Sequence, residues 1–351
     1  MSLVHLYVHG RGRGHGSRSR AVADHLRELS FDVRIFAGRD AYELFESGTV
    51  ERVDSLMPGD GLATVTKLKR RLQDAVRAAR KDGAIAIVSD SDLPGAAAGR
   101  FAKIPSIALG HGIIFSHTQR PAELSRRPWQ RQAVKARTAA SGSHLQIAVN
   151  FCPLKPKRPS TIVAKPVLRA ALQAVINNER APGDAIVCYF RDDNGTKLLK
   201  VLAERGLPTR LFAKENPGIP GISWEPLNAE RFTRALLEAR AVVSSAGSQL
   251  ISECVALGIP QLALYAPSDD EQRLNVELLK TRSLGFGAPF SDSLDELNTF
   301  LERLQSPWMP IDPWHDTNAM DAAESVGKAL TMVVSAGADW KQTLAWPQRN
   351  E

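Results

Sequence analysis

The chain has 351 residues, 43% of them hydrophobic, and carries a formal net charge of +7 at pH 7. This length can hold two hydrophobic cores of roughly 150 residues each. The positive charge raises the question of nucleic-acid binding, but the sequence contains no RNA- or DNA-binding module and no aromatic platform beside the charge, which argues against a nucleic-acid partner.

Cysteine usage and hydropathy indicate the compartment. Cys152, Cys188 and Cys254 share no spacing typical of a metal or redox site. There is no signal peptide and no apolar run approaching a membrane span, so we expect a cytoplasmic protein. Strand-like and helix-like patterns alternate along the chain, which favours parallel sheets covered by helices on both faces.

The N-terminal residues predict a strand, a glycine-rich turn and a helix. Residues 3–8 form an apolar run typical of a buried strand, and residues 10–21 are rich in glycine and arginine. The following helix would bury Ala21, Val22, Leu26 and Leu29. The sequence Gly10-Arg-Gly-Arg-Gly-His-Gly16 matches neither the G-x-G-x-x-G dinucleotide pattern nor a P-loop, so we expect neither site there.

This turn would place His15 at the carboxyl edge of the sheet, where open α/β folds bind their ligands. Histidine titrates near neutral pH and therefore suits general-base catalysis. Residues 84–88 predict another buried strand, and either Asp90 or Asp92 after it could orient His15 as the carboxylate of a dyad. His15 could instead only cap the helix or shape the loop. Asp90 and Asp92 also mimic a D-x-D metal motif, although that motif belongs to a different sheet context.

A histidine after a predicted strand and a basic segment lie between residues 105 and 137. Residues 105–109 predict a strand followed by His111, which could lie on the acceptor side, compete as the base, or be a partly buried hydrogen-bonded histidine. Residues 120–137 form a basic segment around Trp129. We favour a solvated helix face there, with an anionic lipid surface or an anionic ligand as the alternative. The basic residues are Arg126, Arg127, Arg131, Lys135 and Arg137.

Prolines and basic residues between 153 and 166 predict a boundary between two halves. We therefore expect one domain at residues 1–160, a second at 161–320, and a C-terminal helix and tail at 321–351. In the second half, strands are predicted near 163–167, 184–190, 209–213 and 221–224. Arg191 and Leu227 follow two of these strands and could line a pocket, with Leu227 and Pro226 enclosing a nucleobase; simple strand termination is the alternative.

The most informative stretch runs from residue 241 to residue 275. Residues 241–244 predict a buried strand, Gly247 a turn and Ser248 the N-cap of a helix that ends before Gly258 and Pro260. The start of such a helix binds phosphate groups through unpaired N–H groups and its dipole. Glu253 offers a carboxylate acceptor for a ribose diol. After the strand at 261–265, carboxylate and amide side chains at 269–272 could bind sugar hydroxyls.

This stretch resembles the donor-binding signature of GT-B glycosyltransferases, particularly the group related to the lipid II N-acetylglucosaminyltransferase and the UDP-glycosyltransferases (family 28 and family 1-like). The pattern of that group is a glycine, a glutamate six residues later, Gly-x-Pro, and an acidic residue with Gln and Asn. The matching residues are Gly247, Glu253, Gly258, Pro260, Glu271, Gln272 and Asn275. Glu271 stands where many members have aspartate. The turn around Gly12 and Gly14 resembles the Gly-x-Gly-x-Gly-His motif of the same group.

The resemblance implies an α/β fold of two Rossmann-like domains facing across a cleft, with a C-terminal helix that crosses back to the N-terminal domain. It implies a metal-independent, inverting transfer of a hexose from a nucleoside-diphosphate sugar, with a UDP-sugar favoured, to an acceptor hydroxyl of unknown identity. No cofactor is expected beyond this co-substrate. Two alternatives stay open: a UDP-N-acetylglucosamine 2-epimerase-like enzyme of the same fold, and a non-catalytic nucleotide-sugar-binding protein.

The resemblance implies three groups of site residues. The catalytic candidates are His15, Asp90 and Asp92. The acceptor-side candidates are Gly12, Gly14 and His111. The donor-binding candidates are Arg191, Leu227, Ser245, Gly247, Ser248, Gln249, Glu253, Glu271, Gln272 and Asn275.

Overall fold

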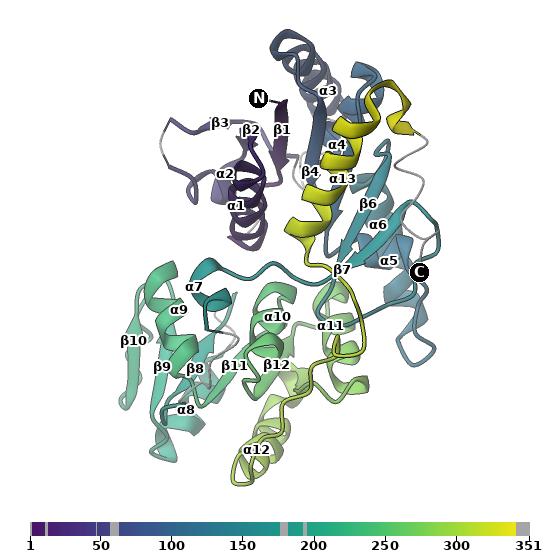
Figure 1. Ribbon diagram of the computed structural model, residues 1–351. Helices are drawn as coiled ribbons and strands as arrows, with labels where there is room; N and C mark the ends of the chain where they lie inside the picture. Colours follow the sequence, from purple (N-terminus) through teal and green to yellow (C-terminus); the bar gives the residue numbers. More distant parts are fainter. Residues whose placement is uncertain are drawn as a thin grey trace. The chain divides into compact units, whose positions relative to one another are not determined.

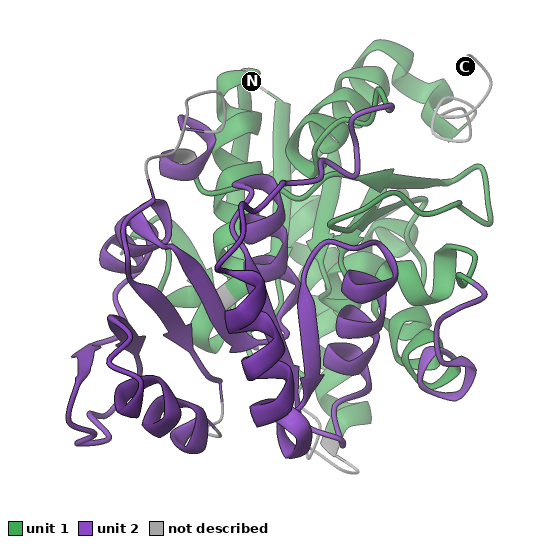
Figure 2. Cartoon of the chain, turned by 90° about the horizontal axis from the view of Figure 1, so that it is seen from below, with its two compact units in different colours: residues 1–121, 130–169, 317–351 green, residues 122–129, 170–316 purple. Residues whose placement is uncertain are grey.

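A computed structural model describes residues 2–10, 13–46, 48–56, 63–175, 182–191 and 195–341. These residues divide between two compact units (Figure 2). The first unit comprises residues 1–121, 130–169 and 317–351, and the second comprises residues 122–129 and 170–316. No helix within the described ranges has both the length and the apolar character needed to cross a membrane.

The first unit is built on a parallel sheet with the strand order β3-β2-β1-β4-β5-β6-β7. Its strands are β1 (Ser2–Val8), β2 (Phe31–Ala37), β3 (Val50–Arg52), β4 (Ala86–Asp90), β5 (Ser106–Gly110), β6 (Leu145–Val149) and β7 (Thr161–Ala164). The central strands β4, β5 and β6 are buried along their whole length, as expected for strands covered on both faces. The strand order reverses between β1 and β4, which is the usual position of a ligand site in a doubly wound sheet.

Helices cover this sheet (Figure 1). They are α1 (Arg13–Glu28), α2 (Arg39–Tyr42), α3 (Ala63–Asp82), α4 (Leu93–Ala102), α5 (Ile113–His117), α6 (Arg126–Ala139, whose first turn is grouped with the second unit) and α13 (Ala322–Ala336), with a short 3-10 turn η2 (Gly337–Asp339) after α13. α13 packs on α1, and its residues Val326 and Leu330 share a core with Val22 and Leu26. The predicted return of the C-terminal helix to the first domain is therefore confirmed.

α1 begins earlier than the sequence suggests. Residues 10–21 were expected to form a turn, but the helix starts at Arg13, so Gly14, His15 and Gly16 lie on its first turn. Gly16 is tightly packed there, because a Cβ atom at this position would come within 2.6 Å of Leu44 Cδ1. The glycine therefore allows the helix to approach the turn after α2 closely.

The second unit contains a second parallel sheet with the order β10-β9-β8-β11-β12-β13. The strands are β8 (Ile186–Tyr189), β9 (Thr209–Phe212), β10 (Ile222–Glu225), β11 (Ala241–Ser245), β12 (Gln261–Tyr265) and β13 (Phe286–Pro289). The helices are α7 (Ala170–Gln173), α8 (Thr196–Glu204), α9 (Ala229–Glu238), α10 (Ser248–Ala256), α11 (Asp270–Thr281), the 3-10 turn η1 (Phe290–Asp292) and α12 (Ser293–Arg303). The two sheets confirm the predicted fold of two Rossmann-like domains.

The proline-rich segment lies within the first unit. β7 pairs with β6 in parallel, with Gln146 opposite Thr161. The segment between these strands is ordered by backbone contacts, including a bridge between Thr118 and Pro156. This segment therefore connects two neighbouring strands of one sheet, and the chain enters the second unit at residue 170.

Candidate functional site

A histidine and a carboxylate meet at the carboxyl edge of the first sheet. β1 and β4 are neighbours, and the backbone N–H of His9 donates to the Asp90 carbonyl at 3.0 Å, so the start of α1 lies beside the end of β4. His15 Nδ1 is 2.8 Å from Asp90 Oδ1, and the His15 side chain is 28% exposed. An ionised carboxylate only accepts, so Nδ1 donates and Nε2 is left as the acceptor nitrogen of the ring.

Asp90 is held as an anion by further donors from α1. It is fully buried and accepts from Arg18 Nε at 2.9 Å, from Arg18 Nη2 at 2.5 Å and from Ser19 Oγ at 3.0 Å. Burial alone would raise the pKa of Asp90, but the Arg18 guanidinium and His15 together hold this pKa well below its usual range. Arg18 is itself only 4% exposed.

Arg18 and Ser19 were not singled out from the sequence. The available signal was their spacing of three and four residues from His15, which places all three on one face of a helix. The glycines at positions 10, 12, 14 and 16 favour a turn and mask this helical periodicity in the sequence. Arg18 Nη2 also lies 3.1 Å from His15 Nδ1. Because a guanidinium only donates, Arg18 competes with the shorter Asp90 contact for this ring nitrogen.

Asp92 has a different position from Asp90. It is the N-cap of α4, where its side chain accepts from Gly95 N at 3.0 Å, and Arg71 Nη2 donates to it at 3.0 Å. Ser91 lies between the two aspartates with a φ of 57°, which turns the chain. Each carboxylate is thus matched by a separate arginine. Nowhere in the described part of the chain do three histidine, cysteine or acidic residues form a group that could hold a metal ion.

His111 follows β5, the neighbour of β4. It is 5% exposed, and its Nδ1 lies 3.1 Å from the Val149 carbonyl, which can only accept, so this nitrogen carries the proton. Its ring contacts Phe115 and Phe151. His111 therefore occupies the same edge of the sheet as Asp90. Gly14 precedes His15 on α1, and Gly12 lies outside the described residues.

In the second unit, β11 leads directly into α10. The expectation that Ser248 caps this helix is wrong: Gly247 is the N-cap and Ser248 is the first helical residue. Since glycine has no side chain, the N-cap residue of α10 makes no side-chain capping hydrogen bond. A Cβ atom at Gly247 would have no atom within 4 Å in the described structure, so there is space beside this residue.

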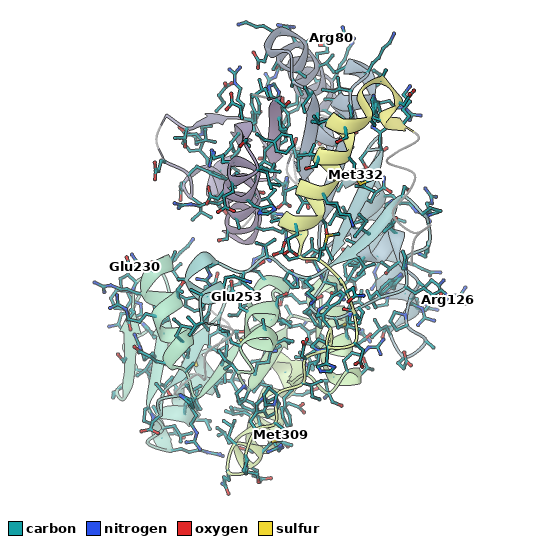
Figure 3. All side chains as sticks on the ribbon, in the orientation of Figure 1. Arg80, Arg126, Glu230, Glu253, Met309 and Met332 are labelled. Atoms are coloured by element: carbon teal, nitrogen blue, oxygen red, sulfur yellow. The ribbon has the colours of Figure 1, made fainter. Side chains whose placement is uncertain are left out.

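Several donor-binding candidates are connected around this helix. Arg191 N donates to Ser245 Oγ at 3.0 Å, and Asn275 Nδ2 of α11 donates to the Ala246 carbonyl at 3.0 Å. Glu253 lies on α10 (Figure 3), is 1% exposed and accepts from Gln249 Nε2 at 3.2 Å. Hydrogen bonds thus link the end of β11 to residue 191 and to α11, and link two side chains within α10.

The remaining donor-binding candidates lie at the start of α11 and after β10. The backbone amides of Glu271 and Gln272 donate to Asp269, the N-cap of α11, each at 3.1 Å. Gln272 itself is buried. Leu227 follows β10, which is separated from β11 by β9 and β8. At about 4.8 Å per strand, this places β10 roughly 14 Å from β11 along the sheet.

Comparisons with known proteins agree with this architecture. The structure of MurG from Acinetobacter baumannii has a TM-score of 0.63 at 16% identity, covering 94% of this chain and 99% of that one. UDP-GlcNAc 2-epimerase from Methanocaldococcus jannaschii has a TM-score of 0.59 at 13% identity, with coverages of 94% and 99%. UGT2 from Phytolacca americana, complexed with UDP-2-fluoro-glucose and pterostilbene, has a TM-score of 0.59 at 12% identity, with coverages of 98% and 98%. At these identities the likeness is one of fold.

Sequence comparison adds the family. No curated protein sequence matches the chain. The model of glycosyl transferase family 1 matches residues 45–305, which is more than half of the chain and spans β4, β5 and nearly the whole second unit. The chain therefore belongs to glycosyl transferase family 1 and has the GT-B fold.

Proposed function

We propose that this protein transfers a hexose from a nucleoside-diphosphate sugar to an acceptor hydroxyl, with inversion at the anomeric carbon. The observation that carries the proposal is the His15–Asp90 pair, in which a buried, ionised carboxylate holds Nδ1 and leaves Nε2 as the acceptor nitrogen. A general base must be oriented in this way to remove a proton as the acceptor oxygen attacks.

In the proposed reaction, His15 Nε2 takes the proton of the acceptor hydroxyl. The acceptor oxygen bonds to the anomeric carbon while the bond from this carbon to the phosphate oxygen breaks. The nucleoside diphosphate leaves with the bonding electron pair. Its negative charge would be stabilised by the backbone amides at the start of α10, whose N-cap residue is a glycine; preorganised donors of this kind are worth ~10²–10³ in rate each.

We assign the donor to the second unit. Ser245, Gly247 and Ser248 would contact the diphosphate, Glu253 with Gln249 the ribose, and Glu271, Gln272 and Asn275 the sugar, with Arg191 and Leu227 further along the sheet edge. A uridine nucleotide is favoured because UGT2 of this fold is described with a UDP-sugar analogue. We further propose that the amides take the place of a metal ion, so that no cofactor is needed beyond the donor. Gly12, Gly14 and His111 would serve the acceptor side.

A transfer assay with paired variants tests the proposal. The chain is incubated with UDP-, dTDP- and GDP-hexoses and a panel of hydroxyl acceptors, and nucleotide release is measured with and without acceptor. We expect His15→Ala to lower the transfer rate ~10²–10⁴-fold while leaving the Kd of the nucleotide unchanged. Glu253→Ala should weaken nucleotide binding about tenfold or more, measured by calorimetry. Full activity of His15→Ala would remove the general-base role.

The similarity to a UDP-GlcNAc 2-epimerase supports a second candidate function. An epimerase inverts C2 of the sugar in UDP-N-acetylglucosamine without an acceptor, whereas a transferase releases UDP rapidly only when an acceptor is present. Proton NMR of this nucleotide sugar incubated with the chain separates the two reactions. Nucleotide binding with no turnover of either kind would instead indicate a non-catalytic binding protein.

For residues 120–137 we favour a solvated helix face and keep peripheral contact with an anionic membrane as the alternative. Arg126 and Arg127 are exposed (Arg126 is labelled in Figure 3), but Trp129 is 4% exposed and does not offer an aromatic anchor. Any membrane contact would therefore be electrostatic and sensitive to salt. Sedimentation with anionic vesicles that disappears at high ionic strength would support it, and no sedimentation at low ionic strength would exclude it.

A further inference from the structure

Four basic side chains of the first unit come together away from the His15–Asp90 pair. They belong to the last residue of α5, the last turn of α6 and the loop between β6 and β7, elements that Figure 1 shows on one side of the first sheet. We call His117, Arg137, Lys157 and Arg158 the basic cluster.

The backbone fixes the cluster in place. The N–H of Lys157 donates to the His117 carbonyl at 2.9 Å, and the N–H of Gln119 donates to the Lys155 carbonyl at 2.8 Å. Lys157 Nζ reaches the Ser116 carbonyl at 3.4 Å, and the Ser116 hydroxyl lies 2.7 Å from His117 Nδ1. The loop is thus held against the end of α5, and its basic side chains are presented by an ordered scaffold.

Within the described part of the chain, the cationic members of the cluster lack a carboxylate partner. Across the described ranges, Arg137, Lys157 and Arg158 form no ion pair with a carboxylate within 4.0 Å. By contrast, Arg18 and Arg71 in the same unit each pair with a buried aspartate. Holding like charges together in this way costs free energy and does not stabilise the fold.

The titration of two members reflects this repulsion. Burial lowers the pKa of His117, and the charges of Arg158, Lys157 and Arg137 lower it further, against a raising contribution from the Ile113 carbonyl. Burial and then the charges of Arg137 and Arg158 likewise lower the pKa of Lys157. A bound anion would relieve the repulsion and favour the imidazolium form of His117.

We propose that the basic cluster is a binding site for a phosphate dianion, carried by inorganic phosphate, a soluble phosphomonoester or a lipid headgroup. Two guanidinium groups offer the planar, paired donors that match phosphate oxygens, and the ammonium of Lys157 adds a third charge. His117 lies on α5, and the charged groups that act on it from the elements around it are Arg137 of α6 and Lys157 and Arg158 of the loop. Binding near pH 7 should therefore take up a proton.

Calorimetry on the full chain tests the site with inorganic phosphate and with glycerol phosphate. Titrations at pH 7 in two buffers of different ionisation enthalpy should give saturable binding and net proton uptake. Lys157→Gln and Arg158→Gln should each weaken binding about tenfold or more, because each removes a charge-assisted contact. His117→Asn should bind without the proton uptake. The matched control is Lys328→Gln, an exposed lysine of α13, which should bind as the wild type does.

Vesicles of phosphatidylcholine with and without phosphatidate separate the possible sources. Sedimentation that requires phosphatidate and is lost in Lys157→Gln would identify a lipid headgroup, whereas binding of the soluble phosphates alone would identify a free ligand. The proposal is overturned if neither probe binds saturably, or if Lys328→Gln weakens binding as much as the cluster variants do. Thermal unfolding of each variant checks that lost binding is not lost folding.

Discussion

At the scale of single residues, Arg18 has the most consequential position. It is nearly buried on α1 and is the main cation opposite Asp90, whose carboxylate is fully buried. A buried carboxylate that loses such a partner is costly, whereas an exposed pair contributes little. Arg18 therefore both stabilises the first unit and keeps Asp90 ionised for His15.

We expect Arg18→Met to lower the free energy of unfolding by about 3–5 kcal/mol, because it leaves a buried charge without its partner. Arg27→Met on the same helix is the control, since Arg27 pairs with Asp24 at the surface and should cost about 0–1 kcal/mol. Urea denaturation followed by circular dichroism measures both. Equal costs for the two variants would show that the Arg18–Asp90 pair is no stronger than a surface pair.

The sequence predicts His15 and two possible carboxylate partners, but it does not show which of the two contacts the histidine. Asp90 and Asp92 both follow the predicted strand, and only the positive φ of Ser91 sends their side chains to different arginines. Such a backbone conformation at a serine has no clear sequence signal. Arg18 and Ser19 were missed because the start of α1 was placed too late, and a helix boundary shifted by two turns hides a spacing of three or four residues.

At the scale of secondary-structure elements, the start of α10 is the feature most open to test. Gly247 has a φ of −74° and a ψ of 130°, values that any residue adopts, so glycine is not required there by the backbone. A Cβ atom would point into open space. What the glycine provides is access to the first amides of the helix.

We expect Gly247→Ala to change the free energy of unfolding by less than about 1 kcal/mol but to weaken nucleotide-diphosphate binding about tenfold, because its methyl group would lie where the phosphates approach. Gly112→Ala is the matched control, since a Cβ atom there also has nothing within 4 Å in the described structure and the backbone φ is −53°. Calorimetry with UDP measures the difference. Unchanged affinity in Gly247→Ala would place the diphosphate elsewhere.

The elements themselves were largely predictable. Apolar runs identified the buried strands, and residues 261–265 coincide with β12. One expectation was wrong at the start of α10, where either a serine or a glycine can be the N-cap. Ser248 looked like an N-cap, but a preceding glycine can occupy that position at little cost. The prolines near 153, expected at a boundary between two halves, lie in the segment that connects β6 to β7.

At the scale of the whole molecule, the two units should respond differently to pH. His5, His117 and His144 are all in the first unit, whereas the second unit contains only His315, which is exposed. Burial lowers the pKa of His5, against Asp82, which raises it. Burial also lowers the pKa of His117 and His144, with help from nearby cations.

These lowered pKa values make the first unit less stable at acidic pH. In the unfolded chain a histidine has its ordinary pKa of 6.5, whereas these folded histidines have a lower pKa. Once the pH falls below about 6.5, the unfolded chain therefore binds more protons than the folded chain. The stability contributed by the three histidines is therefore present above about pH 6.5 and lost as the pH falls through their folded pKa values. The lowered pKa of Asp90 gives a further loss at more acidic pH, below its usual range.

We expect hydrogen exchange of the first unit to accelerate between pH 7 and pH 5 more than that of the second unit, after correction for the intrinsic exchange rate. Mass spectrometry of peptides from β4 to β6 and from β11 to β12 measures the two responses in one sample. His144→Gln should reduce the difference, because it removes one titrating group. A parallel response of both units would contradict the assignment of the pH sensitivity to buried histidines.

The return of α13 to the first core has a consequence for synthesis on the ribosome. Val326 and Leu330 complete a core that begins with Val4 and Leu6, and every residue of the second unit is translated between them. Translation of the first unit therefore begins before that of the second unit and ends after it. The later-made unit can reach its native state while the earlier one still waits for its closing helix, so the nascent N-terminal half must remain protected from aggregation until translation is nearly complete.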